Sequence, residues 1–489
     1  MSSRRPVLLI PIAQHFTIRY LVLTGLLDRL AEHFECVLAV AWRDSELEGE
    51  VERKGARCVS LPEFVPSRAY RVLRNWTISM READMQSPTP PIDRRRMRAV
   101  ECSPRLRLYH GRNRLRNATG RAIAAVEPLR RGMESLEDAA FWSEHACQRL
   151  AKFIEEIGPS LVLSITPFIS SEAALCRVAQ AMGARTVAAI LSFDNLTSRG
   201  KIETVFHHYG VWNSTMKQEA IRIYRVRDDQ VDIIGAPQMD FYVRRELVYD
   251  PKEFFESHRL DARRPVILFA AGPAHISPVE PQILIDLDQI IQNYESQKRP
   301  QILLRPHPVD DERRWSDALS KCINVHVAKS WTVRDCRAGR IRLDDIRELA
   351  SALAYTDVHV STSSTMSLDG AIFDKPQIGL AYDPGAGGRF ARVMAELYQR
   401  EHYLPLTHSG GIEIVRSRED FEASLSAYLR DPSRDSSARR VMVKNLLGIP
   451  MGSATDAAFA MVFQFARREG ILHTKKRESS SPPPMLVTI

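Results

Sequence analysis

The sequence has few cysteines, and no two of them are placed to act together. The seven cysteines are scattered through 489 residues, and no CxxC pair occurs. This distribution excludes a disulfide framework and provides no zinc-ligand spacing. It is typical of a protein that works in a reducing cytoplasm.

Long apolar runs are absent as well. No stretch reaches the ~18 uninterrupted apolar residues that a transmembrane helix needs. The apolar run inside the N-terminal stretch MSSRRPVLLIPIAQHF is only about six residues long, which is too short for a signal peptide. We therefore expect a cytoplasmic protein without a membrane-spanning segment.

Two common ligand signatures are also missing. No GxGxxG fingerprint follows a predicted strand, and no DxD motif lies at the end of one. Asp310-Asp311 and Asp344-Asp345 are adjacent carboxylates that point in different directions, as solvated charges do. We therefore expect no bound metal and no cofactor.

What is present is the pattern of an α/β protein. A chain of 489 residues, 44% hydrophobic and 26% charged, is expected to form two or three soluble domains. Strand and helix patterns alternate through residues 1–245 and again through 265–470, which predicts two Rossmann-like domains. Residues 246–264 are predicted to link them. The low-complexity residues 474–489 are predicted to form a disordered tail.

A basic insertion interrupts the first domain at about residues 62–135. Between Pro66 and Ser135 there are 16 Arg and 6 Asp or Glu, so this segment carries a net charge of +10. The whole chain carries +8, so the rest of the sequence is slightly acidic. Such a segment suits an anionic membrane surface or another polyanion, and a solvated basic face is the alternative. No recognised nucleic-acid module accompanies it, so we expect no nucleic acid partner. The arginines expected to face the membrane or an acceptor are Arg94, Arg95, Arg96, Arg105 and Arg107.

The most informative stretch is residues 341–382. Its pattern is helix, short strand, hydroxyl-rich loop, helix and strand, the order of a parallel βαβ unit. The loop Ser361-Thr362-Ser363-Ser364-Thr365 lies where a strand ends and a helix begins. Hydroxyls, backbone N–H groups and the positive end of a helix dipole would together suit a phosphate. An ordinary Ser/Thr N-cap is the alternative.

A second motif lies about fifty residues upstream, at Arg305-Pro306-His307-Pro308. It follows a predicted strand, at the edge where open α/β sheets bind ligands. The prolines fix the backbone around His307. A histidine held there beside an arginine can hydrogen-bond a phosphoryl oxygen or protonate a leaving phosphate. A lone histidine is more often structural, so it is the pairing with the hydroxyl loop that favours a phosphate site.

Together the two motifs resemble a known family. The second half is similar to nucleotide-sugar glycosyltransferases of the two-Rossmann GT-B architecture, in the branch of CDP-glycerol glycerophosphotransferases, bacterial sialyl- and polysialyltransferases and related capsule enzymes. The resemblance covers about residues 185–385. It implies that His307, Pro308 and the hydroxyls of Ser363, Ser364 and Thr365 hold the donor's phosphates, with Arg305 beside them. Thr362 replaces the tyrosine usual in the glycerophosphotransferases, which favours a sugar donor.

The resemblance implies a GT-B enzyme whose first domain takes the acceptor and whose second takes the nucleotide donor. The expected reaction is inverting, metal-independent transfer of a sugar to a glycan or lipid-linked acceptor in bacterial surface glycan synthesis, at the inner face of the cytoplasmic membrane. Without a metal, His307, Arg305 and loop N–H groups must neutralise the leaving phosphate. The candidates for general base, from the first domain, are Asp194 and His15. Weaker donor-binding candidates are Gly272, Glu280 and Asp369, and an exposed surface carboxylate is the alternative for Glu280.

Other functions remain open from the sequence. A UDP-sugar 2-epimerase has the same fold, but it needs no separate acceptor and leaves the basic insertion without a purpose. A CDP-glycerol-type phosphotransferase and a non-catalytic protein that binds a nucleotide-sugar or a polyanion are further alternatives. The sequence does not fix the oligomeric state.

Overall fold

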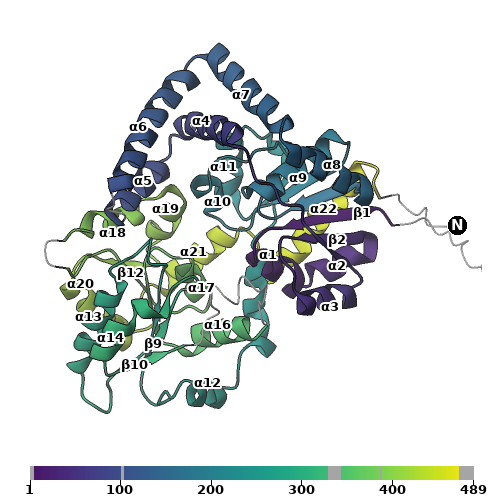
Figure 1. The fold of residues 1–489 in the computed structure, drawn as a ribbon. Helices are drawn as coiled ribbons and strands as arrows, with labels where there is room; N and C mark the ends of the chain where they lie inside the picture. The colour runs from purple at the N-terminus through teal and green to yellow at the C-terminus, as the bar shows by residue number, and fades with distance from the viewer. Residues whose placement is uncertain (1–4, 101–103, 329–342, 386–387, 473–489) are drawn as a thin grey trace, which may run out of the picture.

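The computed structural model describes residues 5–100, 104–328, 343–385 and 388–472. The predicted tail at 474–489 lies outside the described residues. Within them, the chain forms two parallel sheets, each with its own helices (Figure 1). Residues from both halves line one cavity. The two Rossmann-like units predicted from the sequence are therefore confirmed.

The first sheet has seven parallel strands in the order β3-β2-β1-β4-β5-β6-β7. Their bounds are β1 Val7–Ile12, β2 Glu35–Val40, β3 Arg57–Ser60, β4 Leu161–Ser164, β5 Arg185–Ala189, β6 His208–Val211 and β7 Val231–Ile233. The order reverses between β1 and β4, and ligands bind open sheets at such a switch point, beyond the carboxyl ends of the strands.

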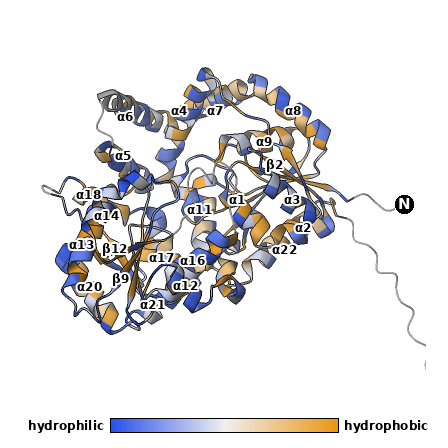
Figure 2. Cartoon of the chain, turned by 60° about the horizontal axis from the view of Figure 1, so that its bottom comes forward, coloured by the Kyte–Doolittle hydropathy of each residue, from blue (hydrophilic) through white to orange (hydrophobic). Residues whose placement is uncertain are grey.

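The second sheet has six parallel strands in the order β10-β9-β8-β11-β12-β13, which reverses between β8 and β11. The strands are β8 Val266–Ala270, β9 Gln301–Arg305, β10 Val325–Val327, β11 Val358–Ser361, β12 Gln377–Leu380 and β13 Glu413–Val415. The central strands are covered on both faces, so they read as unbroken apolar runs and carry the hydrophobic colour in Figure 2.

Helices cover both sheets. Around the first lie α1 Phe16–Ile18, the π-helix η1 Arg19–Leu23, α2 Leu26–His33, α3 Ser45–Arg53, α8 His145–Ile157, α9 Ser170–Ala181, α10 Asn195–Ser198, α11 Ser214–Tyr224 and the 3-10 helix η3 Pro237–Val243. Around the second lie α12 Pro251–Ser257, α13 Glu280–Gln292, α14 Ser316–Lys321, α16 Leu343–Tyr355, α17 Met366–Ile372, α18 Ala391–Leu397, the 3-10 helix η6 Glu401–Tyr403, α19 Leu404–Thr407, α20 Arg418–Arg430 and α21 Ser436–Leu447.

The last helix, α22 (Ala454–Arg468), lies outside the domain to which the sequence analysis assigned it. Its apolar face packs on the first sheet, within one core cluster that also contains residues of β1, β2, β4 and β5. Gly210 in β6 makes room for it, because a Cβ there would lie 2.7 Å from Met461 Sδ. The carboxylate of Asp240 accepts hydrogen bonds from the N–H groups of Gly452 and Thr455, at 2.9 and 2.7 Å, and so anchors the entry into this helix.

The basic insertion forms an arch of four helices: α4 Arg68–Met85, α5 Thr89–Val100, α6 Pro104–Ala124 and α7 Glu127–Trp142. Figure 1 shows the arch above both domains, with α5 beside α18 of the second. Thr89 Oγ1 accepts a bond from the N–H of Glu401 at 2.9 Å, and Arg95 pairs with Glu396 at 2.7 Å. The insertion therefore connects the two domains.

Candidate active site

The two sequence motifs meet in one cavity of about 180 Å³. Arg305, Pro306, His307 and Pro308 follow β9 and form one wall, and Ser364 and Thr365 follow β11 and form another. The first domain contributes Phe16 and Arg19. The cavity thus lies beside the switch point of the second sheet, and the first domain forms part of its wall.

His307 is held in one orientation and in one charge state. Its Nδ1 accepts a hydrogen bond from the backbone N–H of Val309 at 3.2 Å, which leaves the ring proton on Nε2. Burial lowers the pKa of His307 to about 4, against the opposing charge of Asp310. The side chain is therefore a neutral imidazole at pH 7 and offers an N–H donor.

Arg305 ends β9 as a buried side chain. Burial lowers the pKa of its guanidinium, and the carboxylates of Glu348 and Asp345 oppose this shift. An arginine stays charged in either environment. The cavity therefore has a fixed positive charge next to the neutral His307.

The hydroxyl loop after β11 divides its side chains between two directions. Ser364 and Thr365 line the cavity. Ser363, with φ +39°, instead donates its hydroxyl to Leu397 O at 3.1 Å and accepts a bond from Arg400 Nη2 at 2.8 Å. Ser363 thus fastens the loop to the chain around α18. Thr365 stands at the N-cap of α17 without a side-chain capping bond, whereas Ser364 Oγ accepts a hydrogen bond from the N–H of Met366, the first residue of this helix, at 3.2 Å.

Asp369 of α17 also lines the cavity, and it connects to the first domain. Tyr242 of η3 donates its hydroxyl to Asp369, and Arg19 of η1 donates to the same hydroxyl at 3.3 Å. Burial raises the pKa of Asp369, with Arg19 opposing. The sequence analysis did not single out Arg19 or Phe16, because no motif surrounds them and their partners are distant in the chain.

Glu280 lies behind the cavity rather than in it or on the surface. It is fully buried in α13 and accepts bonds from the N–H of Gly272, at 3.0 Å, and from Arg314, also at 3.0 Å. Arg314 in turn donates to Gly272 O at 2.7 Å and pairs with Asp310. Burial raises the pKa of Glu280 to about 7, against Arg314. Glu280 and Gly272 therefore fix the loops after β8 and β9 to each other.

Asp194 does not line the cavity. Its carboxylate accepts bonds from Asn195 Nδ2 at 3.1 Å and from Ser198 Oγ at 2.8 Å. Burial acts to raise its pKa, but His402 and neighbouring hydroxyls outweigh burial and hold the pKa below its usual range. Thr197 Oγ1 lies 3.0 Å from His402 Nδ1, so this loop meets η6 of the second domain.

His15 follows β1 and directly precedes the cavity residue Phe16. Its ring packs against Trp42, with centroids 4.1 Å apart, and its buried Nδ1 has no hydrogen-bond partner among the described residues. Burial lowers the pKa of His15, with Asp44 opposing. His15 is therefore neutral at pH 7.

The arginines of α5, which were expected to face the membrane or an acceptor, form ion pairs and a hydrogen bond within the fold. Arg94 pairs with Glu82 and Arg95 with Glu396, while the buried Arg96 donates to His275 O at 2.5 Å. Arg105 and Arg107 belong to α6, and their side chains lie outside the described residues. Within the described part of the chain, no helix is long and apolar enough to cross a membrane, and no group of His, Cys, Asp or Glu is arranged to hold a metal ion.

Residues 194–464 match the family model of the CDP-glycerol:poly(glycerophosphate) glycerophosphotransferases. The chain belongs to this family. The match covers more than half of the sequence, and it includes both cavity motifs. No curated protein matches the sequence. The expected membership in the glycerophosphotransferase branch is therefore confirmed, and the protein is a transferase.

Solved structures show the fold of this glycerophosphotransferase family member to be GT-B. The UDP-GlcNAc 2-epimerase of Neisseria meningitidis, bound to UDP-GlcNAc, is 11% identical with a TM-score of 0.54, over 94% of this chain and 100% of that chain. S. aureus MnaA with UDP is 10% identical with a TM-score of 0.52, over 96% and 98%. A glycosyltransferase from Rickettsia africae ESF-5 is 9% identical with a TM-score of 0.50, over 95% and 98%. At such identities the likeness establishes the fold alone.

Proposed function

We propose that this transferase moves a sugar from a nucleotide donor to a glycan or lipid-linked acceptor in bacterial surface glycan synthesis, with inversion and without a metal. The observation that carries the proposal is the cavity in which Arg305 and His307 face Ser364 and Thr365. A fixed cation, a neutral N–H donor and two hydroxyls suit the oxygens of a nucleotide diphosphate.

In the proposed reaction an acceptor hydroxyl attacks the anomeric carbon of the donor sugar. The bond from that carbon to the phosphate oxygen breaks, and the nucleotide leaves with the bonding electrons. Arg305 balances the growing charge, and His307 donates its Nε2–H to a phosphate oxygen. The hydroxyl proton goes to a general base on the first domain.

We assign the general base to His15 rather than Asp194. His15 is a neutral imidazole whose Nδ1 has no partner among the described residues, and its neighbour Phe16 lines the cavity. Both carboxylate oxygens of Asp194 already accept hydrogen bonds, and the pKa of Asp194 lies below its usual range. Such a carboxylate is a weak proton acceptor.

The second candidate is transfer of glycerol phosphate, which the family match favours. There the acceptor hydroxyl attacks the β-phosphorus of CDP-glycerol, and CMP leaves. The departure at Thr362, in place of the usual tyrosine, favours the sugar. The 2-epimerase alternative rests on likeness of fold alone.

The donor site is tested by thermal shift with CMP, CDP, UDP and GDP on the wild type, His307→Ala and His145→Ala, a matched control at an exposed histidine of α8. One nucleotide should raise the Tm of the wild type and of the control but not of His307→Ala. Incubation with the matching sugar donor or with CDP-glycerol, followed by ³¹P NMR of the released nucleotide, then separates the two reactions. If no nucleotide raises the Tm, the proposal fails.

We also propose that the protein works as a peripheral protein at the inner face of the cytoplasmic membrane, through the outer surface of α6 and α7. Leu115, Leu129 and Leu136 are each more than half exposed there, and Arg114 and Arg121 are exposed too. Exposed leucines among arginines suit an anionic lipid surface. Vesicles containing phosphatidylglycerol should bind the wild type more tightly than Arg114→Glu/Arg121→Glu. Equal binding of the two proteins would contradict this.

A further inference from the structure

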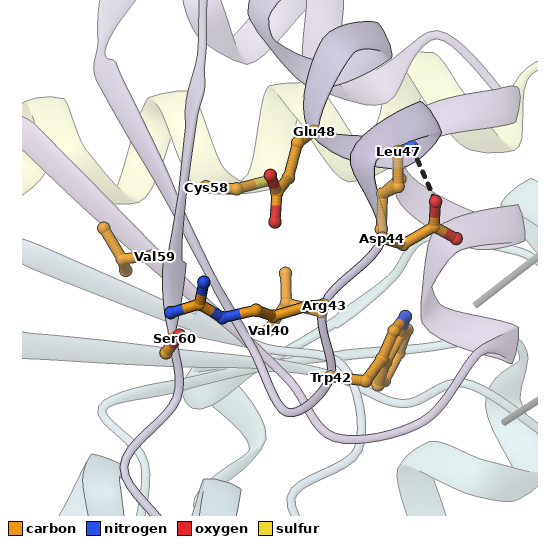
Figure 3. A pocket seen from close by; sticks show the side chains of 9 residues that line it. All are labelled: Val40, Trp42, Arg43, Asp44, Leu47, Glu48, Cys58, Val59 and Ser60. Atoms are coloured by element: carbon orange, nitrogen blue, oxygen red, sulfur yellow. Dashed lines mark hydrogen bonds between the residues drawn. The ribbon is translucent and has the colours of Figure 1, made fainter. Parts of the chain in front are cut away.

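A second cavity of about 360 Å³ lies in the first domain, and it shares no lining residue with the donor cavity. It opens where β2 and β3 end and α3 begins, at the same edge of the first sheet as the loop that carries His15. Figure 3 shows its walls. The polar and aromatic side chains that line it are Trp42, Arg43, Asp44, Glu48, Cys58 and Ser60.

The lining of the cavity includes one arginine and one glutamate whose charged groups have no bonding partner in the described part of the chain. In Figure 3 the Arg43 side chain runs along one side toward Ser60, and Glu48 reaches into the space from α3. Both residues are exposed, and neither side chain forms a hydrogen bond or ion pair with any residue in the described part of the chain. By contrast, Asp44 caps α3 by accepting the N–H of Glu46 at 3.0 Å. The free donors and acceptors are thus those of Arg43 and Glu48.

Trp42 joins this cavity to the proposed general base. Its indole lines the cavity and packs on the ring of His15, whose neighbour Phe16 lines the donor cavity. His15 therefore lies between the two cavities along one loop. A molecule in the second cavity that extends past Trp42 would reach the imidazole.

We propose that this cavity binds the end of the acceptor, a hydroxyl-rich group that carries a phosphate, so that its reacting hydroxyl lies at His15. The inference rests on the proposed function. Arg43 pairs with the phosphate, because guanidinium geometry matches phosphate oxygens. Glu48 accepts bonds from hydroxyls, and the face of Trp42 packs against the C–H groups of the polyol or sugar. Cys58 stays a neutral thiol, since burial and Glu48 raise its pKa to about 12.

Binding is tested with protein labelled with 5-fluorotryptophan, in which Trp42→Phe identifies one of the six tryptophan resonances in the ¹⁹F spectrum. The probes are sn-glycerol 3-phosphate, inorganic phosphate and N-acetylglucosamine. Glycerol 3-phosphate should shift the Trp42 resonance in a saturable way, with inorganic phosphate weaker and the neutral sugar weakest. No shift with glycerol 3-phosphate, or a shift of Trp42 with nucleotides only, overturns the proposal.

The charge is tested by Arg43→Glu against Arg53→Glu, a matched change at an exposed arginine at the end of α3, outside the cavity. Losing a charge-assisted hydrogen bond should raise the Kd of glycerol 3-phosphate about tenfold or more. Arg53→Glu should leave it unchanged, and nucleotide binding should survive in both. An equal effect of the two changes overturns the assignment. If the ¹⁹F resonance of Trp42 does not shift although a nucleotide binds, this inference alone is wrong. If no nucleotide binds, the proposed function is wrong.

Discussion

Each domain buries a glutamate behind the loops at the carboxyl edge of its sheet, but the two side chains find different partners. Glu172 of α9 accepts bonds from the N–H groups of Ala13, at 3.0 Å, and Thr166, at 3.1 Å, and from nearby hydroxyls. Glu280 of α13 accepts from Gly272 and from the charged Arg314. Burial raises the pKa of both carboxyls to about 7.

The comparison shows how the two halves differ in their loops. Glu172 ties the loop after β1, which carries His15, to the loop after β4 by hydrogen bonds with uncharged groups. Glu280 ties the loop after β8 to the loop after β9 through a buried ion pair. The helices that carry them follow different strands of the fold, β4 in the first domain and β8 in the second. In both domains a buried glutamate therefore holds two loops of the carboxyl edge together, although the two domains share no repeated sequence.

The largest effect is expected for Glu280→Gln. At pH 8, where the carboxyl of Glu280 is mostly ionised, removing this partner of the buried ion pair leaves Arg314 undercompensated, which costs about 3 kcal/mol. Urea denaturation should show this loss, and the folded variant should bind the donor nucleotide more weakly, because the loops beside Arg305 and His307 lose their anchor. A variant as stable as the wild type would show that Asp310 alone holds Arg314.

Glu172→Gln should cost less, about 1 kcal/mol. The amide keeps one acceptor oxygen, and the hydroxyls of Ser164 and Thr166 can rotate to accept from its NH₂ group. The same urea experiment measures it, and donor nucleotide binding should change less than in Glu280→Gln, because Glu172 bonds to no residue that lines the donor cavity. A loss as large as that of Glu280→Gln would break the distinction between charged and uncharged anchoring.

The pH dependence of stability sharpens the comparison further. The pKa of each glutamate is near 7 in the folded state and about 4.5 when unfolded. The folded state therefore binds more protons, and this contribution to stability falls as pH rises from about 4.5 to 7. The cost of Glu172→Gln should be larger at pH 5 than at pH 7.5.

His307 has the opposite sign and serves as the control. Its pKa is about 4 in the folded state, below the usual 6.5, so its contribution to stability falls as pH drops through that window. The cost of His307→Gln should therefore be smaller at pH 5 than at pH 7.5. Parallel pH profiles for Glu172→Gln and His307→Gln would contradict both assignments.

The smallest effect concerns the link between the halves, Arg95 of α5 and Glu396 of α18, 2.7 Å apart. The Arg95 side chain is 38% exposed, so the pair is expected to contribute only about 0.5 kcal/mol. Arg95→Glu and Glu396→Arg should each destabilise slightly, and the double variant should recover most of the loss. A double-mutant cycle in urea measures the coupling, and strictly additive losses would show that the pair does not bridge the domains.

Much of the fold could be predicted from the sequence, because buried parallel strands consist of continuous runs of β-branched and aliphatic residues. The strands from Val266 and Gln301 are examples. The edge strands Val325–Val327 and Glu413–Val415 were missed, since each is three residues long and only partly buried. The return of α22 to the first sheet was missed as well, since an amphipathic pattern does not say which sheet it will cover.

The site residues that belong to short contiguous motifs could be predicted from the sequence. Those whose role depends on contacts with distant parts of the chain could not. Arg305, His307, Ser364 and Thr365 belong to contiguous motifs, and the structure brings them to one cavity. The opposite orientation of Ser363 depends on a positive φ and on contacts with Leu397 and Arg400. The role of the α5 arginines depends on partners as much as 301 residues away, which no local pattern records.

The packing of α22 has a consequence for how the protein is made. A ribosome delivers β1 before it translates the second domain, but the helix that covers this side of the first sheet begins only at Ala454, after that domain. The nascent first domain therefore keeps an apolar surface open while nearly the whole second domain is translated. During that interval chaperones have a binding surface on the growing chain, and the first domain reaches its final core only after the second has been synthesised.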